Sequence, residues 1–179
     1  IRFLISLAFL PNLGPIIDIF ALISKAKRSS FFCVIKISLT FNSSSICDFT
    51  LENKFTSSLD SKYTKTLEIG CGTNTCFSTI PVINKIGVDP ESGGNIRETS
   101  DNFFKNNKKE FDVIFIDGLH ICEQCRKDII NSLKFLNRNG FIFLHDMIPR
   151  SWIEENVPRL ESVWSGNVWK VALELIKTK

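Results

Sequence analysis

The sequence predicts a three-layer α/β fold of the Rossmann type, in which helices flank a mostly parallel sheet. Residues 111–117 form a nearly continuous apolar run closed by Gly118, as expected of a strand buried on both faces. Residues 121–138 carry apolar side chains at helical spacing, and residues 141–145 follow as a second apolar strand. A strand, a helix and a strand at this spacing form a βαβ unit, whose two strands are parallel.

The remaining elements are shorter. Three further segments are expected to be strands: residues 66–69, residues 85–89 and, more weakly, residues 95–99. Gly140 is a natural C-terminal stop for the helix over 121–138. Residues 168–176 are expected to supply one more helix or strand.

The chain divides by composition into an irregular N-terminal segment of uncertain fold, residues 1–64, and a regular domain, residues 65–179. Residues 3–24 are apolar but interrupted by two prolines and an aspartate, which argues against a clean membrane span. Three interpretations stay open for them: a packing or capping element, which we favour, a membrane or targeting segment, or a stretch without an evolved fold.

The amino-acid composition and net charge limit the classes of binding partner that we expect. The 179 residues suffice for one domain with a sizeable core, and 44% hydrophobic with 23% charged residues is ordinary for a soluble protein. The net charge is only +3, and residues 65–179 hold fifteen basic and fifteen acidic side chains. We therefore expect neither a nucleic-acid partner nor a membrane.

The six cysteines show no dense disulfide framework, so we expect reduced thiols in a cytoplasmic protein. Cys122 and Cys125 have the spacing of a zinc half-site, with Cys71 and Cys76 as a conceivable second half. Both residues of the first pair fall on the apolar stripe of the predicted helix, however, where cysteine behaves as a small hydrophobic residue. We prefer that interpretation.

Acidic side chains sit repeatedly where predicted strands end. They are Glu68, Asp89, Asp117 and Asp146. In open parallel sheets, ligands bind beyond the carboxyl ends of the strands, near the point where the strand order reverses. Four acidic residues at four such ends therefore predict one shared site.

A glycine pair supports a nucleotide-type ligand there. Gly70 and Gly72 follow the first strand, and glycine lets the backbone approach a ligand closely. Asp89 comes nineteen residues after Gly70, at the end of the next strand, where a carboxylate can accept hydrogen bonds from ribose hydroxyls.

Several segments together resemble a known family. They are residues 68–72, 86–90, 99–104, 111–120 and 144–146. They resemble class I S-adenosylmethionine-dependent methyltransferases, and within these the branch of bacterial sugar and macrolide O-methyltransferases and related uncharacterised enzymes. The resemblance covers about 105 residues. That family usually has a third glycine in its first motif, and here Asn74, which tolerates left-handed backbone angles, stands in that place.

The resemblance implies cofactor residues for S-adenosylmethionine. By position they are Glu68, Gly70 and Gly72 beside the methionine part, Asp89 at the ribose, Ser100 and Asp101 at the adenine, and Asp117. It also implies a final antiparallel strand pair. This chain stops before one, so we expect a domain truncated at its C-terminal strands or completed by residues 1–64.

The resemblance further implies a divalent metal such as Mg²⁺ at Asp117 and Asp146, with His120 as general base. The implied reaction methylates a hydroxyl of a sugar or other small molecule. A cation held by carboxylates lowers the pKa of that hydroxyl, and an imidazole can take its proton near neutral pH.

Simpler interpretations stand beside these. His120 could cap the next helix or bond to backbone, and we expect His145 to be a core histidine or one that supports the ligands. Trp152, Trp164 and Trp169 are expected to pack rather than line a pocket. At the level of function, the alternatives are an NAD-dependent oxidoreductase and a non-catalytic, truncated Rossmann-like module.

Overall fold

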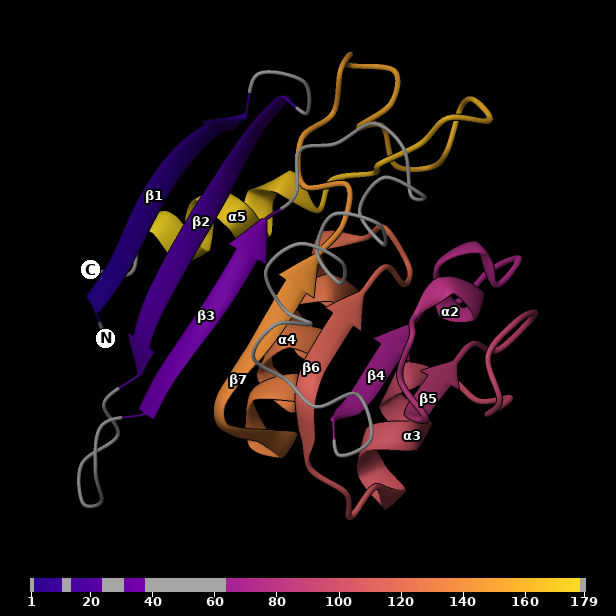
Figure 1. Ribbon diagram of the computed structural model, residues 1–179. Helices are drawn as coiled ribbons and strands as arrows, with labels where there is room; N and C mark the ends of the chain where they lie inside the picture. The colour runs from indigo at the N-terminus through magenta and orange to yellow at the C-terminus, as the bar shows by residue number, and fades with distance from the viewer. Residues whose placement is uncertain (1, 11–13, 24–30, 38–63, 178–179) are drawn as a thin grey trace.

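The computed structural model describes residues 2–10, 14–23, 31–37 and 64–177. Its strands are β1 (Arg2–Leu10), β2 (Gly14–Ile23), β3 (Phe31–Ile37), β4 (Lys65–Ile69), β5 (Asn84–Val88), β6 (Phe111–Ile116) and β7 (Leu136–Leu144). Its helices are α2 (Thr75–Thr79), α3 (Ser100–Asn106), α4 (Cys122–Phe135) and α5 (Trp169–Lys177). All these strands join one sheet in the order β1-β2-β3-β7-β6-β4-β5 (Figure 1).

The sheet is mostly parallel, as predicted. β4 pairs in parallel with β5 and β6, β6 with β7, and β7 with β3, whereas β2 runs antiparallel to both of its neighbours. The chain passes from β4 to β5 on one side and returns to β6 on the other. The strand order therefore reverses between β4 and β6, the place where open α/β sheets bind ligands.

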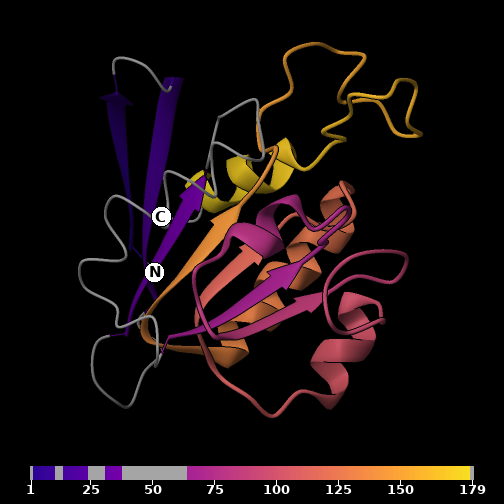
Figure 2. The ribbon, with the colours of Figure 1, turned by 45° about the vertical axis from the view of Figure 1, so that its right-hand side comes forward.

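Helices cover both faces of this sheet within the described residues. Along β6, Ile114 and Ile116 face a core shared with α3, α4 and α5, while Val113 and Phe115 face a smaller core that includes Cys76 of α2. Figures 1 and 2 show α3, α4 and α5 on one side. The predictions of a three-layer fold and of a strand buried on both faces are confirmed.

The C-terminal end of α4 differs from the expectation. The helix ends at Phe135, and the chain enters β7 directly, so Gly140 lies inside the strand rather than at a helix end. A Cβ at Gly140 would meet the carbonyl oxygen of Asp112 at 2.9 Å, beside an irregularity in the β6–β7 pairing. The absence of a side chain at Gly140 therefore allows β6 and β7 to approach each other closely at this point. The prediction of a weak strand at residues 95–99 is also wrong. Only a single β-bridge, between Val88 and Ile96, forms in that segment.

The N-terminal strands extend the same sheet. β1 and β2 occupy most of the apolar stretch 3–24, and β3 lies beside β7 in parallel register (Figure 1). Residues 38–63 lie outside the described residues, so the domain boundary at residue 64 stays a prediction. No helix in the described part of the chain has the length and hydrophobicity needed to cross a membrane.

Two cysteine predictions can be compared with the structure. Cys71, Cys122 and Cys125 are free and buried, and the last two belong to the main core. Cys76 is disulfide-bonded, so the expectation that every thiol is reduced is wrong. Spacing along the chain does not reveal which thiols meet across a fold.

Candidate functional site

A cleft of about 860 Å³ opens at the carboxyl ends of β4, β5 and β6, at the reversal of strand order. Among the residues lining it are eight that the sequence singles out: Glu68, Gly70, Gly72, Asp89, Ser100, Asp101, Asp117 and His120. Asp146 is not in the lining, but its carboxylate lies close to that of Asp117. The structure thus brings the predicted site residues together around one cleft.

The glycine loop, residues 70–74, forms one wall. Gly70, Gly72 and Asn74 all have positive φ, so the expectation that Asn74 tolerates the left-handed conformation is confirmed. A Cβ on Gly70 would clash with the backbone carbonyl of Asp117, whereas a Cβ on Gly72 would meet open space. Gly70 is therefore required by the packing of β4 against β6, and Gly72 leaves room on the cleft side.

Asp89 fixes this loop in place. Its Oδ2 accepts hydrogen bonds from the backbone N–H groups of Cys71 (3.0 Å) and Gly72 (2.9 Å), and its Oδ1 accepts from Glu91 and Ser92 (both 2.8 Å). Burial alone would raise the pKa of Asp89, but these N–H donors outweigh it and lower the pKa. A ribose contact would have to share or replace some of these four bonds.

The residues predicted to border the adenine are held in place by a side chain of helix α4. Ser100 and Asp101 begin α3, and Nε2 of Gln124 lies within hydrogen-bond distance of Ser100 Oγ (3.1 Å), Asp101 Oδ1 (3.2 Å) and Asp128 Oδ1 (3.1 Å). Asp128 is buried, and burial raises its pKa to about 6. The sequence analysis did not identify Gln124, since a polar residue beside a helix's apolar stripe is usually exposed to solvent.

Glu68 lies at the floor of the cleft and is 1% exposed. Its Oε2 finds no hydrogen-bond partner among the described residues. Burial first, and then the charge of Asp117, raise the pKa of Glu68 to about 8. The side chain is therefore protonated at neutral pH and would gain from a cationic ligand beside it.

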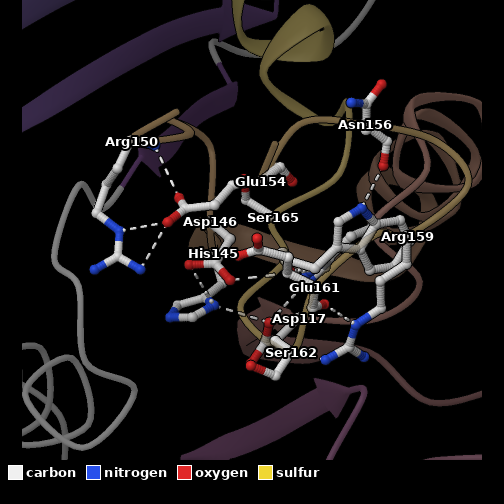
Figure 3. Close-up of polar contacts among 12 residues, drawn as sticks. Asp117, His145, Asp146, Arg150, Glu154, Asn156, Arg159, Glu161, Ser162 and Ser165 are labelled. Atoms are coloured by element: carbon white, nitrogen blue, oxygen red, sulfur yellow. Dashed lines mark hydrogen bonds and ion pairs between the residues drawn. The ribbon is translucent and has the colours of Figure 1, made fainter. Parts of the chain in front are cut away.

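The acid–histidine cluster, formed by Asp117, His120, His145 and Asp146, reaches the same cleft through Asp117 and His120. One ligand atom from each residue lies within 4.8 Å of all the others. Asp117 follows β6, and His145 and Asp146 follow β7, so parallel pairing of these strands brings them together (Figure 3).

The two histidines are held differently. Nδ1 of His120 lies 2.8 Å from the carbonyl oxygen of Trp164, and its Nε2 lies 3.1 Å from Asp117 Oδ1. A carbonyl only accepts, so Nδ1 carries a hydrogen and Nε2 faces the carboxylate. Nδ1 of buried His145 lies 2.9 Å from Asp117 Oδ1 and 3.4 Å from Asp146 Oδ1, ion-pair distances. Neither ring nitrogen of His145 is aligned for a hydrogen bond within the described residues.

These contacts set the charge of the cluster. Burial alone would lower the pKa of His145, but its contacts with Asp117 and Asp146 raise it to about 10. Asp117 likewise raises the pKa of His120 against the effect of burial. Asp117 itself is buried, yet the two imidazoles outweigh that burial and lower its pKa. The cluster therefore favours the protonated form of both imidazoles and the ionised form of Asp117.

The donor set fits a divalent cation. His145 is 7% exposed, and its ring nitrogens have no hydrogen-bond partner among the described residues, which is costly unless a ligand completes the site. Carboxylates suit Mg²⁺ and Mn²⁺, and imidazoles suit Zn²⁺ and Fe²⁺. Sequence analysis assigned His145 a core or supporting role, because its place at the end of an apolar strand gave no sign of the neighbouring carboxylates.

A loop over residues 148–166 lies against the cluster (Figure 3). The backbone N–H groups of Ser165 and Gly166 donate to the carbonyl oxygen of Glu154 (3.1 and 2.9 Å), and Nε1 of Trp164 donates to that of Asn156 (2.5 Å). A Cβ on Gly166 would clash with the carbonyl of His120. The loop is therefore closed on itself and packed directly against the histidine.

The tryptophan predictions fail at two positions. Trp164 lines the cleft, with its ring centroid 5.8 Å from that of His120, and Trp152 is 68% exposed rather than packed. Both belong to the 148–166 loop, whose course no periodic pattern reveals. Of the simpler roles expected for His120, capping of α4 is wrong, since the N–H of Cys122 is bound by Asn167 Oδ1 at 2.6 Å. A bond to backbone is confirmed by its 2.8 Å contact with the carbonyl oxygen of Trp164.

Comparison with known proteins agrees with this geometry. Residues 90–147 match the family model described as "Methyltransferase domain", a region that holds α3, β6, α4, β7 and all four residues of the acid–histidine cluster. No curated protein and no solved structure matches the chain. The matched region and the Rossmann-like sheet support a methyltransferase domain, which implies the use of S-adenosylmethionine.

Proposed function

We propose that the protein transfers the methyl group of S-adenosylmethionine to a hydroxyl of a small molecule, such as a sugar or another diol, with the help of a divalent cation. The observation that carries the proposal is that one cleft joins the glycine loop and Asp89 to the acid–histidine cluster. The first wall suits a nucleoside, and the second suits activation of a hydroxyl.

The chain's main task is to position the reactants. A methyl group on a sulfonium is already activated, so its transfer depends on in-line placement. The open side of Gly72 lets the ligand approach the backbone, and Ser100 and Asp101 border the predicted adenine site. Glu68 supplies a buried carboxyl group that gains charge stabilisation from a cation in the cleft.

The acceptor hydroxyl needs more help because its pKa is high. A divalent cation at Asp117 and Asp146, with His145 as a nitrogen donor, would lower that pKa and fix the oxygen. His120 holds its hydrogen on Nδ1 toward Trp164, which leaves Nε2 as the atom that can take the hydroxyl proton. Asp117 raises the pKa of His120, so any proton held on Nε2 would have to leave before this atom could act as a base.

The histidine content makes this proposal testable. The chain has two histidines, and both belong to the acid–histidine cluster. In tag-free protein, the imidazole NMR spectrum therefore reports on the cluster alone. Adding Mn²⁺ should broaden both signals, and Mg²⁺ or Zn²⁺ should shift them, with the strongest binding identifying the preferred ion.

Methyl transfer is measured in parallel, with isotope-labelled S-adenosylmethionine and a panel of sugars and vicinal diols, with and without EDTA. Transfer that stops on chelation and returns with the ion supports the metal-assisted proposal. Full transfer in EDTA would remove the cation from it. Binding of NAD but not S-adenosylmethionine in calorimetry would overturn the methyltransferase itself.

A further inference from the structure

Arg159 is the one lysine or arginine among the described residues that line the cleft. The other fully charged types in the lining are acidic: Glu68, Asp89, Glu91, Asp101 and Asp117. Acidic walls suit a cationic cofactor, but they do not explain a guanidinium. The arginine therefore indicates a ligand feature that the cofactor's positive charges do not supply.

The Arg159 guanidinium is held in place without being neutralised. Its Nε donates to the carbonyl oxygen of Glu161 at 2.7 Å, and one terminal nitrogen donates to the carbonyl oxygen of Ser162 (Figure 3). These are neutral acceptors, and within the described residues no carboxylate forms an ion pair with Arg159. Of its five N–H donors, three remain for a ligand.

The position of Arg159 places it near the acid–histidine cluster. Its Cζ lies 5.9 Å from the centre of the Trp164 ring, and that ring lies 5.8 Å from the ring of His120. One aromatic ring thus separates the guanidinium from the histidine. Because Trp164 is fixed at Nε1 and at its carbonyl oxygen, the spacing is built into the 148–166 loop.

We infer that the methyl acceptor carries a carboxylate in addition to the hydroxyl, on the same ring. The hydroxyl lies at the acid–histidine cluster, the ring lies along Trp164, and Arg159 binds the carboxylate. A single planar fork of N–H donors matches a carboxylate in a bidentate manner, and arginine against an aromatic ring is a favourable arrangement for it. The inference rests on the proposed function, because it names the acceptor class of that site.

Two ligand sources share this chemistry, aromatic hydroxy acids and uronic acids, and matched pairs separate them. The pairs are 3,4-dihydroxybenzoate with catechol, and galacturonate with galactose. Binding is measured by calorimetry on the full chain saturated with S-adenosylhomocysteine. We expect the acid of at least one pair to bind about 10-fold or more tightly than its neutral partner.

Three variants test whether Arg159 causes the preference for the acid over its neutral partner. Arg159→Gln should abolish it, Arg159→Lys should retain part of it, and Arg138→Gln, which removes an exposed charge from the amino-terminal half of β7, should leave it unchanged. All three should bind S-adenosylhomocysteine as the unmodified chain does. A selective loss of that binding in Arg159→Gln would assign the arginine to the cofactor's carboxylate and overturn the inference.

The remaining outcomes are distinct. Equal affinity for acid and neutral partner, absence of binding by either, or a preference that survives in Arg159→Gln would contradict the anionic acceptor alone. A chain that fails to bind S-adenosylhomocysteine would contradict the proposed function as well. Methyl transfer to the preferred acid, with a raised KM in Arg159→Gln, would support both.

Discussion

The two walls of the cleft are built on opposite principles. At the glycine loop, the Asp89 carboxylate receives four backbone N–H groups, so the loop is complete without any ligand. In the acid–histidine cluster, side chains from two strand ends converge, and both ring nitrogens of His145 stay without a hydrogen bond among the described residues.

The difference teaches how each wall meets its ligand. In the glycine loop the Asp89 carboxylate already accepts four hydrogen bonds, so the loop keeps its conformation without a ligand. The ligand meets a preformed backbone surface there. The cluster leaves imidazole nitrogens available to a ligand, and a cation that binds there would have to displace imidazole protons, so the charge state and stability of the cluster depend on what is bound. Changes in the cluster should alter charge and chemistry, and changes in the loop should alter fit.

The largest effect is expected from Asp117→Asn, which keeps the shape of the cluster and removes its central charge. Methyl transfer should fall about 1,000-fold, because both the cation and the histidine depend on this carboxylate. The pKa of His145, about 10 in the unmodified chain, and the raised pKa of His120 should both fall, as NMR titration of the two imidazoles can measure.

The same variant has a pH signature in stability. Both histidines have pKa values raised by folding, so their protonation stabilises the fold fully below about pH 6.5, and this stabilisation is lost as pH rises toward 10. The stability lost in Asp117→Asn should therefore be greatest near pH 6 and shrink at alkaline pH. A loss that is equal at every pH would contradict the charge pairing.

A second test concerns the glycine loop. Gly72→Val should weaken S-adenosylmethionine binding about 100-fold, because its side chain would occupy open space in the cleft. The left-handed φ of +49° adds strain of about 1–2 kcal/mol. Gly72→Ala shares much of that strain with far less volume and should bind better than the valine variant. Unchanged calorimetric affinity in Gly72→Val would mean that the cofactor lies elsewhere.

The fold and the glycine loop could be predicted from sequence because their causes are local. The apolar run over 111–117 specifies a doubly buried strand, and the left-handed conformation of Asn74 follows from its residue type and place. The end of α4 was missed since Gly140 suits both a helix end and a close strand contact.

The cluster could be predicted only in part. Asp117 and Asp146 mark ends of two neighbouring strands, which topology brings together. His145 and Trp164 acquire their surroundings from the 148–166 loop and from strand pairing, and no sequence period carries that information. Residues whose role depends on tertiary contacts therefore escape sequence patterns.

A smaller effect should come from Glu68→Gln, which separates stability from binding. Folding raises the pKa of Glu68 from 4.5 to about 8, so the fold loses stability as pH rises through that window, and the loss is complete above it. Glutamine cannot ionise, so the variant should be more stable than the unmodified chain by roughly 4 kcal/mol at pH 8 and little different at pH 4.5. Its affinity for cationic S-adenosylmethionine should nevertheless fall. Thermal unfolding at both pH values and calorimetry check the two parts, and a gap independent of pH would contradict the buried carboxyl group.

The smallest effect is expected at Gln124, whose amide connects Ser100, Asp101 and Asp128. Gln124→Met keeps the length of the side chain and removes its donors, so the start of α3 should loosen and the affinity for S-adenosylhomocysteine should fall about 3- to 10-fold. Since these residues border the predicted adenine site, the discrimination against S-inosylhomocysteine, which lacks the 6-amino group, should shrink as well. Glu123→Met, at the exposed neighbouring position, is the matched control and should change neither value. The two imidazole NMR signals should stay in place, because the acid–histidine cluster is untouched. If Gln124→Met binds both nucleosides more weakly by the same factor, the network supports the fold of the wall and does not select the base.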